Sequence, residues 1–397
     1  MSAAQAARFG GERREELRGR LLACGFDVVR FASAAPAGGE ALRAWLAAGM
    51  HADMAWMERT VDKRGDASLV LEGARSVVVL GVNYRGSEAF ERELAATALP
   101  RWARYALHED YHDTIKPGLV AAGRVLEEWC GAAATDYRFY TDTGPVLERG
   151  FAARAGAGFR GKNGMLISRE HGNWLFLAVI LTRVPIEPDA PLRPDVVRVT
   201  GDEPTGLLCG KCTRCIEACP TAAITAPGVV DARRCISYQT IENKGVIPRE
   251  LRAGIGARVY GCDVCLEVCP WNRFAREGRK TLLVAREELA ALTLGDLLAL
   301  TPEKFAATFR RTAVKRLKLS GLLRNACVVA GNSGDAAHVP GLVALARHEL
   351  PLVRAHAVWA VRRIAGERAV ELLAAVRAVE ADATVLAEYA AADAGRT

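Results

Sequence analysis

The chain has 397 residues, of which 50% are hydrophobic and 25% charged, and its formal net charge is +7. This length allows two or three domains, and the composition is typical of a globular protein. The first residues lack an apolar run, so we expect no signal peptide. The longest apolar stretch, 174–181, is far shorter than the roughly 20 residues that span a bilayer. We therefore expect a cytoplasmic protein without a membrane partner.

The sequence predicts a mixture of helices and strands up to about residue 182. Residues 12–75 are predicted to be mainly helical, with a first helix that ends at the capping glycine Gly25. The β-branched run 76–84 predicts a buried strand, and 111–131 has helical spacing. Residues 159–182 predict two strands joined by a turn at the sequence His-Gly-Asn. Helices mixed with hairpin-joined strands indicate an α+β fold.

The second half of the chain differs from the first in its amino-acid composition. Four prolines in 184–195 predict a linker, and the chain becomes alanine-rich beyond residue 320. Similar apolar segments begin at Leu323 and Val353, and each is followed by a second one. They predict two short HEAT-like units, with an irregular helical tail as the alternative. The expected domains are 1–198, a cysteine-rich module at 199–275, a basic helical connector at 276–319 and helical repeats at 320–397.

Eight of the 11 cysteines lie between residues 209 and 269. The first run, C-x2-C-x2-C-x3-C-P, is typical of ferredoxins with two [4Fe–4S] clusters, in which the fourth cysteine ligates the other cluster. The second run lacks its first cysteine, since Val259 stands there, and Cys235 is the one cysteine between the runs. We therefore predict one cluster on Cys209, Cys212, Cys215 and Cys269, and a second on Cys219, Cys235, Cys262 and Cys265.

Two structural zinc sites are the alternative for these cysteines, although zinc ribbons do not use such a triple run. The remaining cysteines, Cys24, Cys130 and Cys327, lie in apolar helical stretches, where a thiol packs as a small hydrophobic group. Because clusters relay single electrons, the first domain is expected to hold a substrate and a one-electron cofactor such as a flavin, haem or corrin. The cobalt-ligand motif D-x-H-x-x-G is incomplete, because Ile115 replaces its glycine.

Between Lys304 and Arg324 the chain has seven basic residues and no acidic one. A solvated helix face is the simpler interpretation of this basic stripe. The other interpretation is a surface that binds phosphates.

Several segments together resemble the epoxyqueuosine reductase family and the related corrinoid reductive dehalogenases. These segments are 104–116, 140–167, the two cysteine runs with 235–245 between them, 322–335 and the helical tail. The resemblance extends from about residue 10 to the end of the chain. The tail favours the tRNA-modifying family, whose longer members add HEAT-like units.

The resemblance implies a nitroreductase-like domain that binds base-off cobalamin without a histidine ligand from the incomplete motif. It implies that two [4Fe–4S] clusters feed this cofactor from an external one-electron donor of the flavodoxin or ferredoxin type. The implied reaction is the reduction of epoxyqueuosine to queuosine at the wobble position of tRNA, the last step of queuosine biosynthesis. We expect the chain to act as a monomer.

Removing the epoxide oxygen as water takes two electrons and two protons, so an acid is needed near the oxygen. Asp142, in Asp-Thr-Gly-Pro, matches the proton donor proposed for the family. On the residues alone, an aspartate in this sequence is more often a turn residue. The resemblance also assigns to the cofactor or substrate pocket Tyr105, Asp142, Arg160, Lys162, Asn163, Ser237, Tyr238 and Gln239.

With the resemblance, the basic stripe becomes a candidate tRNA-binding surface that contacts phosphates. Its residues are Arg310, Arg311, Lys315, Arg316, Lys318 and Arg324. One alternative function is a corrinoid iron–sulfur reductase of a small molecule, which would need neither the stripe nor the repeats. Another is a protein that transfers electrons or binds RNA without catalysis of its own.

Overall fold

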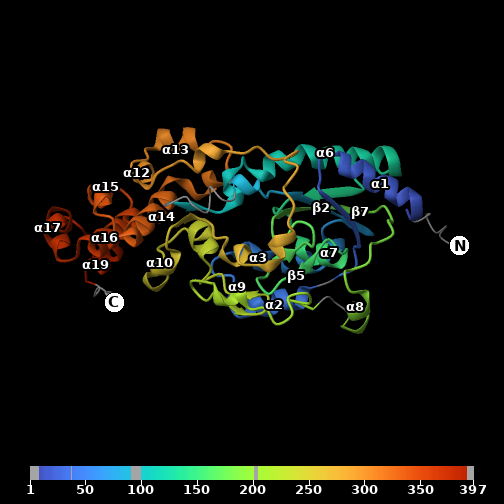
Figure 1. Ribbon diagram of the computed structural model, residues 1–397, viewed down its shortest axis with the longest axis horizontal. Helices are drawn as coiled ribbons and strands as arrows, with labels where there is room; N and C mark the ends of the chain where they lie inside the picture. The colour runs from blue at the N-terminus through green and yellow to red at the C-terminus, as the bar shows by residue number, and fades with distance from the viewer. Residues whose placement is uncertain (1–8, 37, 91–99, 201–203, 391–397) are drawn as a thin grey trace. The chain divides into compact units, whose positions relative to one another are not determined.

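The computed structural model describes residues 9–36, 38–90, 100–200 and 204–390, and Figure 1 shows its helices and strands. Contacts divide the chain into two compact units. Unit 1 comprises 1–88, 111–232 and 264–284, and unit 2 comprises 89–110, 233–263 and 285–397.

These units are discontinuous and do not follow the four consecutive segments expected from the sequence, because strands and helices far apart in the chain pack together. The mixed helix and sheet fold is confirmed. Within the described residues, no helix is long and apolar enough to cross a membrane.

The centre of unit 1 is a four-stranded antiparallel sheet with the order β1-β2-β7-β4. Its strands are β1 Val28–Ser33, β2 Ser76–Asn83, β7 Leu175–Thr182 and β4 Tyr137–Tyr140. Every residue of β2 is buried, as the apolar run predicts. The strand therefore forms the interior of the unit.

Helices cover both faces of this sheet (Figure 1). On one face, helix α7 Glu148–Arg154 contributes Phe151 to a cluster with Val77 and Val79 of β2. Val78 and Leu80 face the opposite side, because side chains alternate along a strand. There helices α1 Gly11–Ala23 and α6 Tyr111–Cys130 pack against each other and against the sheet.

The region from 12 to 75 is mainly helical, as predicted, but it also contains strand β1, which was not predicted. After α1, the chain enters strand β1 and then the short helices α2 Gly39–Ala47, α3 Ala55–Arg59, α4 Val61–Gly65 and η1 Ala67–Leu69. Gly25 follows the end of α1 with a φ of +104°, a value that glycine adopts most easily. The predicted end of the first helix is confirmed.

The predicted hairpin at 159–182 is divided differently. Strands β5 Phe159–Arg160 and β6 Leu166–Ile167 pair only two residues each with one another. The long strand β7 instead pairs with β2 and β4. The His-Gly-Asn turn therefore precedes β7 but does not join the main strands of the sheet.

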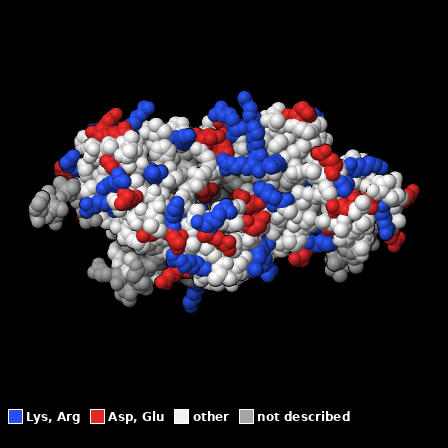
Figure 2. Space-filling view, turned by 180° about the vertical axis from the view of Figure 1, so that it is seen from behind, with Lys and Arg blue, Asp and Glu red and all other residues white. Residues whose placement is uncertain are grey.

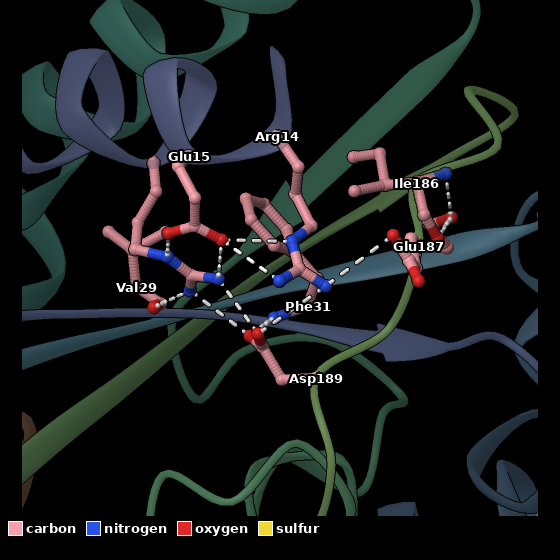
Figure 3. A network of polar contacts seen from close by, with 9 residues as sticks. Arg14, Glu15, Val29, Phe31, Ile186, Glu187 and Asp189 are labelled. Carbon is pink, nitrogen blue, oxygen red and sulfur yellow. Dashed lines mark hydrogen bonds and ion pairs between the residues drawn. The ribbon is translucent and has the colours of Figure 1, made fainter. Parts of the chain in front are cut away.

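The proline-rich segment 184–195 is anchored to unit 1 through Asp189, as Figure 3 shows. The backbone N–H of Phe31 donates to Oδ2 of Asp189 at 2.8 Å, and the backbone N–H of Asp189 donates to the Phe31 carbonyl at 2.8 Å. Arg18 of α1 donates to both carboxylate oxygens at 2.7 and 3.0 Å. The segment thus ties α1 to β1 before the chain continues into α8 Pro194–Thr200.

Unit 2 consists mainly of helices around one apolar core. They are α10 Arg249–Ile255, α12 Leu294–Leu298, α13 Pro302–Thr308, α14 Lys318–Ser333, α15 Val339–Leu345, α16 Pro351–Ala365, α17 Ala369–Leu372, α18 Ala374–Arg377 and α19 Ala383–Ala390. The two similar segments beginning at Leu323 and Val353 lie in α14 and α16, which pack on each other. The parallel strand pair β3 Arg101–Trp102 and β10 Arg258–Tyr260 also belongs to unit 2.

Candidate functional site

Four cysteines of unit 1 line one small pocket. Three belong to the first run, whose loop leads into the one-turn helix α9 Arg214–Glu217, and the fourth precedes η4 Pro270–Phe274. The four are Cys209, Cys212, Cys215 and Cys269. They are the ligands expected for the first cluster, so the structure brings this set together. Their role as ligands remains a prediction.

The loop of the first cysteine run is held by side chains from outside it. Lys162 Nζ donates to the carbonyls of Gly210 at 2.7 Å and Cys212 at 3.1 Å. Trp271 Nε1 donates to the carbonyl of Leu208 at 3.3 Å. Lys162, which was predicted for the cofactor pocket, therefore fixes the backbone that presents the thiols.

The donor set fits a multi-iron cluster. A [4Fe–4S] cluster is held by four cysteine thiolates, and four cysteines line this pocket. Burial raises the pKa of the Cys209 and Cys215 thiols, so iron must displace protons from them. Thiols spread around one pocket suit the corners of a cubane.

The four cysteines expected to bind the second cluster are divided between the units. Cys219 and Cys265 belong to unit 1, and Cys235 and Cys262 belong to unit 2. In unit 1, the sulfur of Cys219 accepts a hydrogen bond from a backbone N–H at 3.2 Å. In unit 2, Ser237 Oγ donates to the Cys262 carbonyl at 3.5 Å. The second cluster remains a prediction from the sequence.

Asp142 lies on the loop after β4, with a φ of +57° and a side chain that is 69% exposed. Tyr111 Oη, at the start of α6, donates to its Oδ2 at 2.5 Å, and His112 Nε2 lies 4.0 Å from the same oxygen. The Tyr111 ring stacks on Phe176 of β7, with 4.3 Å between ring centroids. The first turn of α6 thus positions the carboxylate. Tyr111 was not among the predicted site residues, although it lies in a segment that carries the resemblance.

The other residues expected in the cofactor or substrate pocket belong to both units. In unit 1, Arg160 is half-buried, and the buried Asn163 donates to Asn173 Oδ1 at 2.9 Å and to the Cys265 carbonyl at 3.2 Å. Asn163 therefore orders the chain beside a cysteine.

In unit 2, Tyr105 lies on η2 Arg104–Leu107, with its ring centroid 6.1 Å from that of Tyr260. Ser237 is half-buried, whereas Tyr238 and Gln239 are buried in the π-helix η3 Tyr238–Glu242. The Gln239 amide donates to the Arg233 carbonyl at 2.6 Å and accepts from Asn243 at 2.7 Å. These contacts give Gln239 a structural role within unit 2.

Most of the basic stripe is exposed, but acidic residues accompany it. Arg311 lies 2.8 Å from Glu109, and Arg316 forms an ion pair with Asp110. The remaining exposed members are Arg310, Lys315 and Lys318. Figure 2 likewise shows basic and acidic side chains interspersed on the face it presents. The basic residues of this one segment, counted alone, therefore overstate the net positive charge of the surface on which they lie.

The prediction that Arg324 binds tRNA is wrong, because its side chain is fully buried in α14. Its guanidinium donates to the carbonyls of Asn243 at 2.6 Å, Gly245 at 2.8 Å and Gln239 at 2.7 Å. Asn325 Oδ1 accepts two further bonds from it. Burial lowers the pKa of Arg324 to about 10. Arg324 therefore holds the segment that follows η3 and is not available to phosphates.

Two family models match the chain. Residues 208–272 match the 4Fe-4S double cluster binding domain, and residues 64–143 match "Epoxyqueuosine reductase QueG, DUF1730". The chain is 38% identical over 324 residues to the epoxyqueuosine reductase of Vibrio cholerae, which covers 81% of this chain and 83% of that protein. It is 36% identical over 321 residues to that of Escherichia coli, covering 81% of each.

Solved structures agree with these matches. A crystal structure of epoxyqueuosine reductase with an epoxyqueuosine-modified tRNA-Tyr stem loop has a TM-score of 0.81 and 28% identity, covering 94% of this chain and 96% of that one. The structure of the Bacillus subtilis enzyme has a TM-score of 0.78 and 29% identity, covering 94% of this chain and 96% of that one. In that structure the catalytic loop, which bears an aspartate, is swung out of the active site.

The fold and the cysteine pocket, with the double-cluster match, define an iron–sulfur protein of the [4Fe–4S] class. Given its identity to the curated relatives, the chain belongs to the epoxyqueuosine reductase family, and it is an oxidoreductase.

Proposed function

We propose that this chain reduces epoxyqueuosine to queuosine at the wobble position of tRNA. The observation that carries the proposal is the likeness, over 94% of the chain, to an epoxyqueuosine reductase structure that holds an epoxyqueuosine-modified stem loop. The reaction breaks both C–O bonds of the epoxide and forms an alkene. It consumes two electrons and two protons, and the oxygen leaves as water.

The cysteines of the two runs, with Cys235, would hold two [4Fe–4S] clusters, and these would relay single electrons to cobalamin from an external donor of flavodoxin or ferredoxin type. The double-cluster match and the pocket of four cysteines support the iron–sulfur part of this route. When bound, cobalamin supplies two-electron reduction at a strained C–O bond. The residues of this chain that we assign to its pocket or to the substrate are Tyr105, Asp142, Arg160, Lys162, Asn163, Ser237, Tyr238 and Gln239.

The finer description of the domains belongs to the same proposal. The antiparallel sheet with helices on both faces supports a nitroreductase-like domain within 1–198. Consecutive helices of unit 2, with α14 and α16 packed on each other, support HEAT-like units within 320–397. The module at 199–275 carries the clusters, and the connector at 276–319 presents basic residues to tRNA.

Asp142 is the group that gives a proton to the leaving oxygen. Its carboxyl is exposed on a loop and oriented by Tyr111, as a donor to a bound substrate must be. The catalytic loop of the Bacillus subtilis enzyme also bears an aspartate. Asparagine has nearly the same size as aspartate but cannot donate a carboxyl proton.

We therefore expect Asp142→Asn to keep clusters and tRNA binding but to lose roughly 10²–10⁴-fold in single-turnover rate, the usual worth of a general acid. The matched control is Asp136→Asn, because Asp136 is another surface aspartate of unit 1 and pairs with Arg183. A rate for Asp142→Asn within about threefold of the control would remove Asp142 from the reaction.

The proposed function can be tested in cells that lack their own epoxyqueuosine reductase. Expression of this chain should replace epoxyqueuosine by queuosine in bulk tRNA, as measured by nucleoside mass analysis. The Escherichia coli relative is the positive control, and Cys212→Ala the negative one. Unchanged epoxyqueuosine in cells that contain folded, iron-loaded protein would contradict the proposal.

A further inference from the structure

The half-buried side chain of Lys162 reaches the loop that carries the first cysteines. Its Nζ donates to the carbonyl of Gly210 at 2.7 Å and to that of Cys212 at 3.1 Å. Lys162 and Arg214 line the same pocket as the four thiols, and no acidic residue within the described part of the chain lines it. A cluster held by these thiols would therefore lie beside positive charge that no carboxylate of the pocket cancels.

Three features confine the lysine to this position. Its own backbone carbonyl accepts from the N–H of Gly228 at 2.9 Å. Its aliphatic stem runs past Gly206, where a Cβ would lie 2.9 Å from Cγ of Lys162 and 3.3 Å from Cε. The same glycine fastens the cysteine loop, because its carbonyl accepts from the backbone N–H of Cys209 at 2.8 Å. The ammonium group is therefore held near the loop by packing as well as by its hydrogen bonds.

The contacts of Lys162 also orient two peptide groups of the loop. The C=O and the N–H of a trans peptide point in opposite directions, so Lys162 fixes the N–H groups of Lys211 and Thr213 too. Neither N–H donates to another described residue. Both are therefore available to sulfur, and hydrogen bonds to the sulfurs are among the factors that set the potential of an iron–sulfur cluster.

Charge is the second factor through which Lys162 acts on a cluster. Reduction adds one negative charge, so a nearby cation stabilises the reduced form more than the oxidised form. Glu217 and Glu267 oppose this effect from an adjoining hollow, which shares Arg214 and Cys269 with the pocket. These two carboxylates and Arg214 are exposed, so water and salt screen them more than the half-buried Lys162. Lys162 therefore contributes the least screened charge of this group.

We propose that Lys162 raises the reduction potential of the first cluster, so that an external donor of the flavodoxin or ferredoxin type can reduce it. This inference rests on the proposed function, in which the cluster relays electrons from such a donor. In this step the donor loses one electron and the cluster gains it, while no proton moves and no covalent bond changes. Lys162 acts through the cysteine loop and is therefore a positioning residue.

The direct test is a redox titration of cluster-loaded protein without cobalamin or tRNA, followed by the EPR signals of the reduced clusters. The parent protein should show two reduction steps, one for each cluster. In Lys162→Met, which keeps the apolar stem, the equilibrium constant for one step should fall on the order of tenfold, which is about 59 mV for one electron. The other step should stay at the parent potential. Iron and sulfide analysis checks that the loop still holds its cluster.

Two further variants separate the charge of Lys162 from its contacts with the loop. Lys162→Arg keeps the positive charge, so its potential should stay close to that of the parent protein. Lys162→Gln keeps a donor for the loop but has no charge, so its potential should fall toward that of Lys162→Met. If Lys162→Met loses the cluster, the comparison of Lys162→Gln with Lys162→Arg decides. Lys63→Met is the matched control and should change neither step, because Lys63 is an exposed lysine of unit 1 outside the cysteine pocket.

Potentials of Lys162→Met and Lys162→Gln equal to those of the control would overturn the inference, and so would equal shifts of both steps. The proposed function would stand in either case, provided that the parent protein converts epoxyqueuosine with a chemical reductant. If the parent protein does not convert it, the proposed function fails, whatever the potentials.

Discussion

Replacing Arg324 by methionine should loosen the segment that follows the π-helix in unit 2. Methionine keeps the length and the apolar stem of the side chain but removes every donor. The buried carbonyls of Gln239, Asn243 and Gly245 then lose donors that lie 2.6 to 2.8 Å away. Each such loss costs about 1–3 kcal/mol, partly offset because a buried charge is removed. We expect a net loss of about 3–5 kcal/mol, as when one partner leaves a buried charged network.

Amide hydrogen exchange over residues 239–245 measures this loss locally. Since each 1.4 kcal/mol is tenfold, exchange should become about 10²–10⁴-fold faster in Arg324→Met. Arg324→Lys keeps the charge but has fewer and less well-oriented donors, so its exchange rate should lie between those of the parent protein and Arg324→Met. Arg316→Met is the control: that side chain is 52% exposed and in a surface pair, worth about 0–1 kcal/mol. Exchange in Arg324→Met within threefold of this control would refute the reasoning.

The remaining predictions concern the clusters, tRNA binding and pH. Cys235→Ala should lower iron and sulfide from about eight of each toward four, whereas Cys130→Ala should leave them unchanged; full iron content in Cys235→Ala would disprove the ligand assignment. Glutamine at four exposed basic positions should weaken tRNA binding, and the salt dependence of binding should become flatter by up to about one unit per lost phosphate contact. The positions are Arg310, Arg311, Lys315 and Arg316. If the variant binds tRNA as tightly as the parent protein at all salt concentrations, the stripe is only a solvated face. Complete burial and the nearby Arg252 hold the pKa of His356 well below its usual range. The contribution of His356 to the free energy of unfolding should therefore be full above about pH 6.5 and fall by up to about 1.4 kcal/mol per pH unit below it. Urea titrations at several pH values should show that the free energy of unfolding depends less on pH in His356→Gln.

The His356 prediction follows from its hydrogen bonds. Nε2 accepts from the backbone N–H of Ile247 at 3.2 Å, so Nδ1 carries the proton and donates to the Leu352 carbonyl at 2.7 Å. Protonation of Nε2 would break the first bond and bury a charge. Stability that does not change between pH 7 and 5.5 would contradict this account.

Local periodicity was enough to predict the elements with strong patterns. The apolar run at β2 and the helical spacing of α6 were read correctly, because a fully buried strand and a long amphipathic helix each impose their own period. Strand β1 was missed since it is a six-residue edge strand between helices. The long strand β7 was assigned to a hairpin because the sequence does not show that its partners are β2 and β4.

The site was predictable where spacing dictates geometry and not where distant segments meet. The short spacings of the first cysteine run place its thiols around one pocket, and Cys269 joins them from the second run. By contrast, the burial of Arg324 depends on carbonyls at 239–245, about 80 positions away in the sequence. The acidic partners Glu109 and Asp110 likewise lie outside the basic segment they neutralise. A count of charges within one segment detects neither effect.

Conversion of the modified nucleoside by purified protein tests the central claim most directly. The chain, loaded anaerobically with iron, sulfide and cobalamin, would be incubated with a low-potential reductant and tRNA that carries epoxyqueuosine. We predict that mass analysis will show the modified nucleoside losing one oxygen, in a reaction that requires reductant and fails in Cys212→Ala. An unchanged nucleoside, with both clusters present and tRNA bound, would contradict the account.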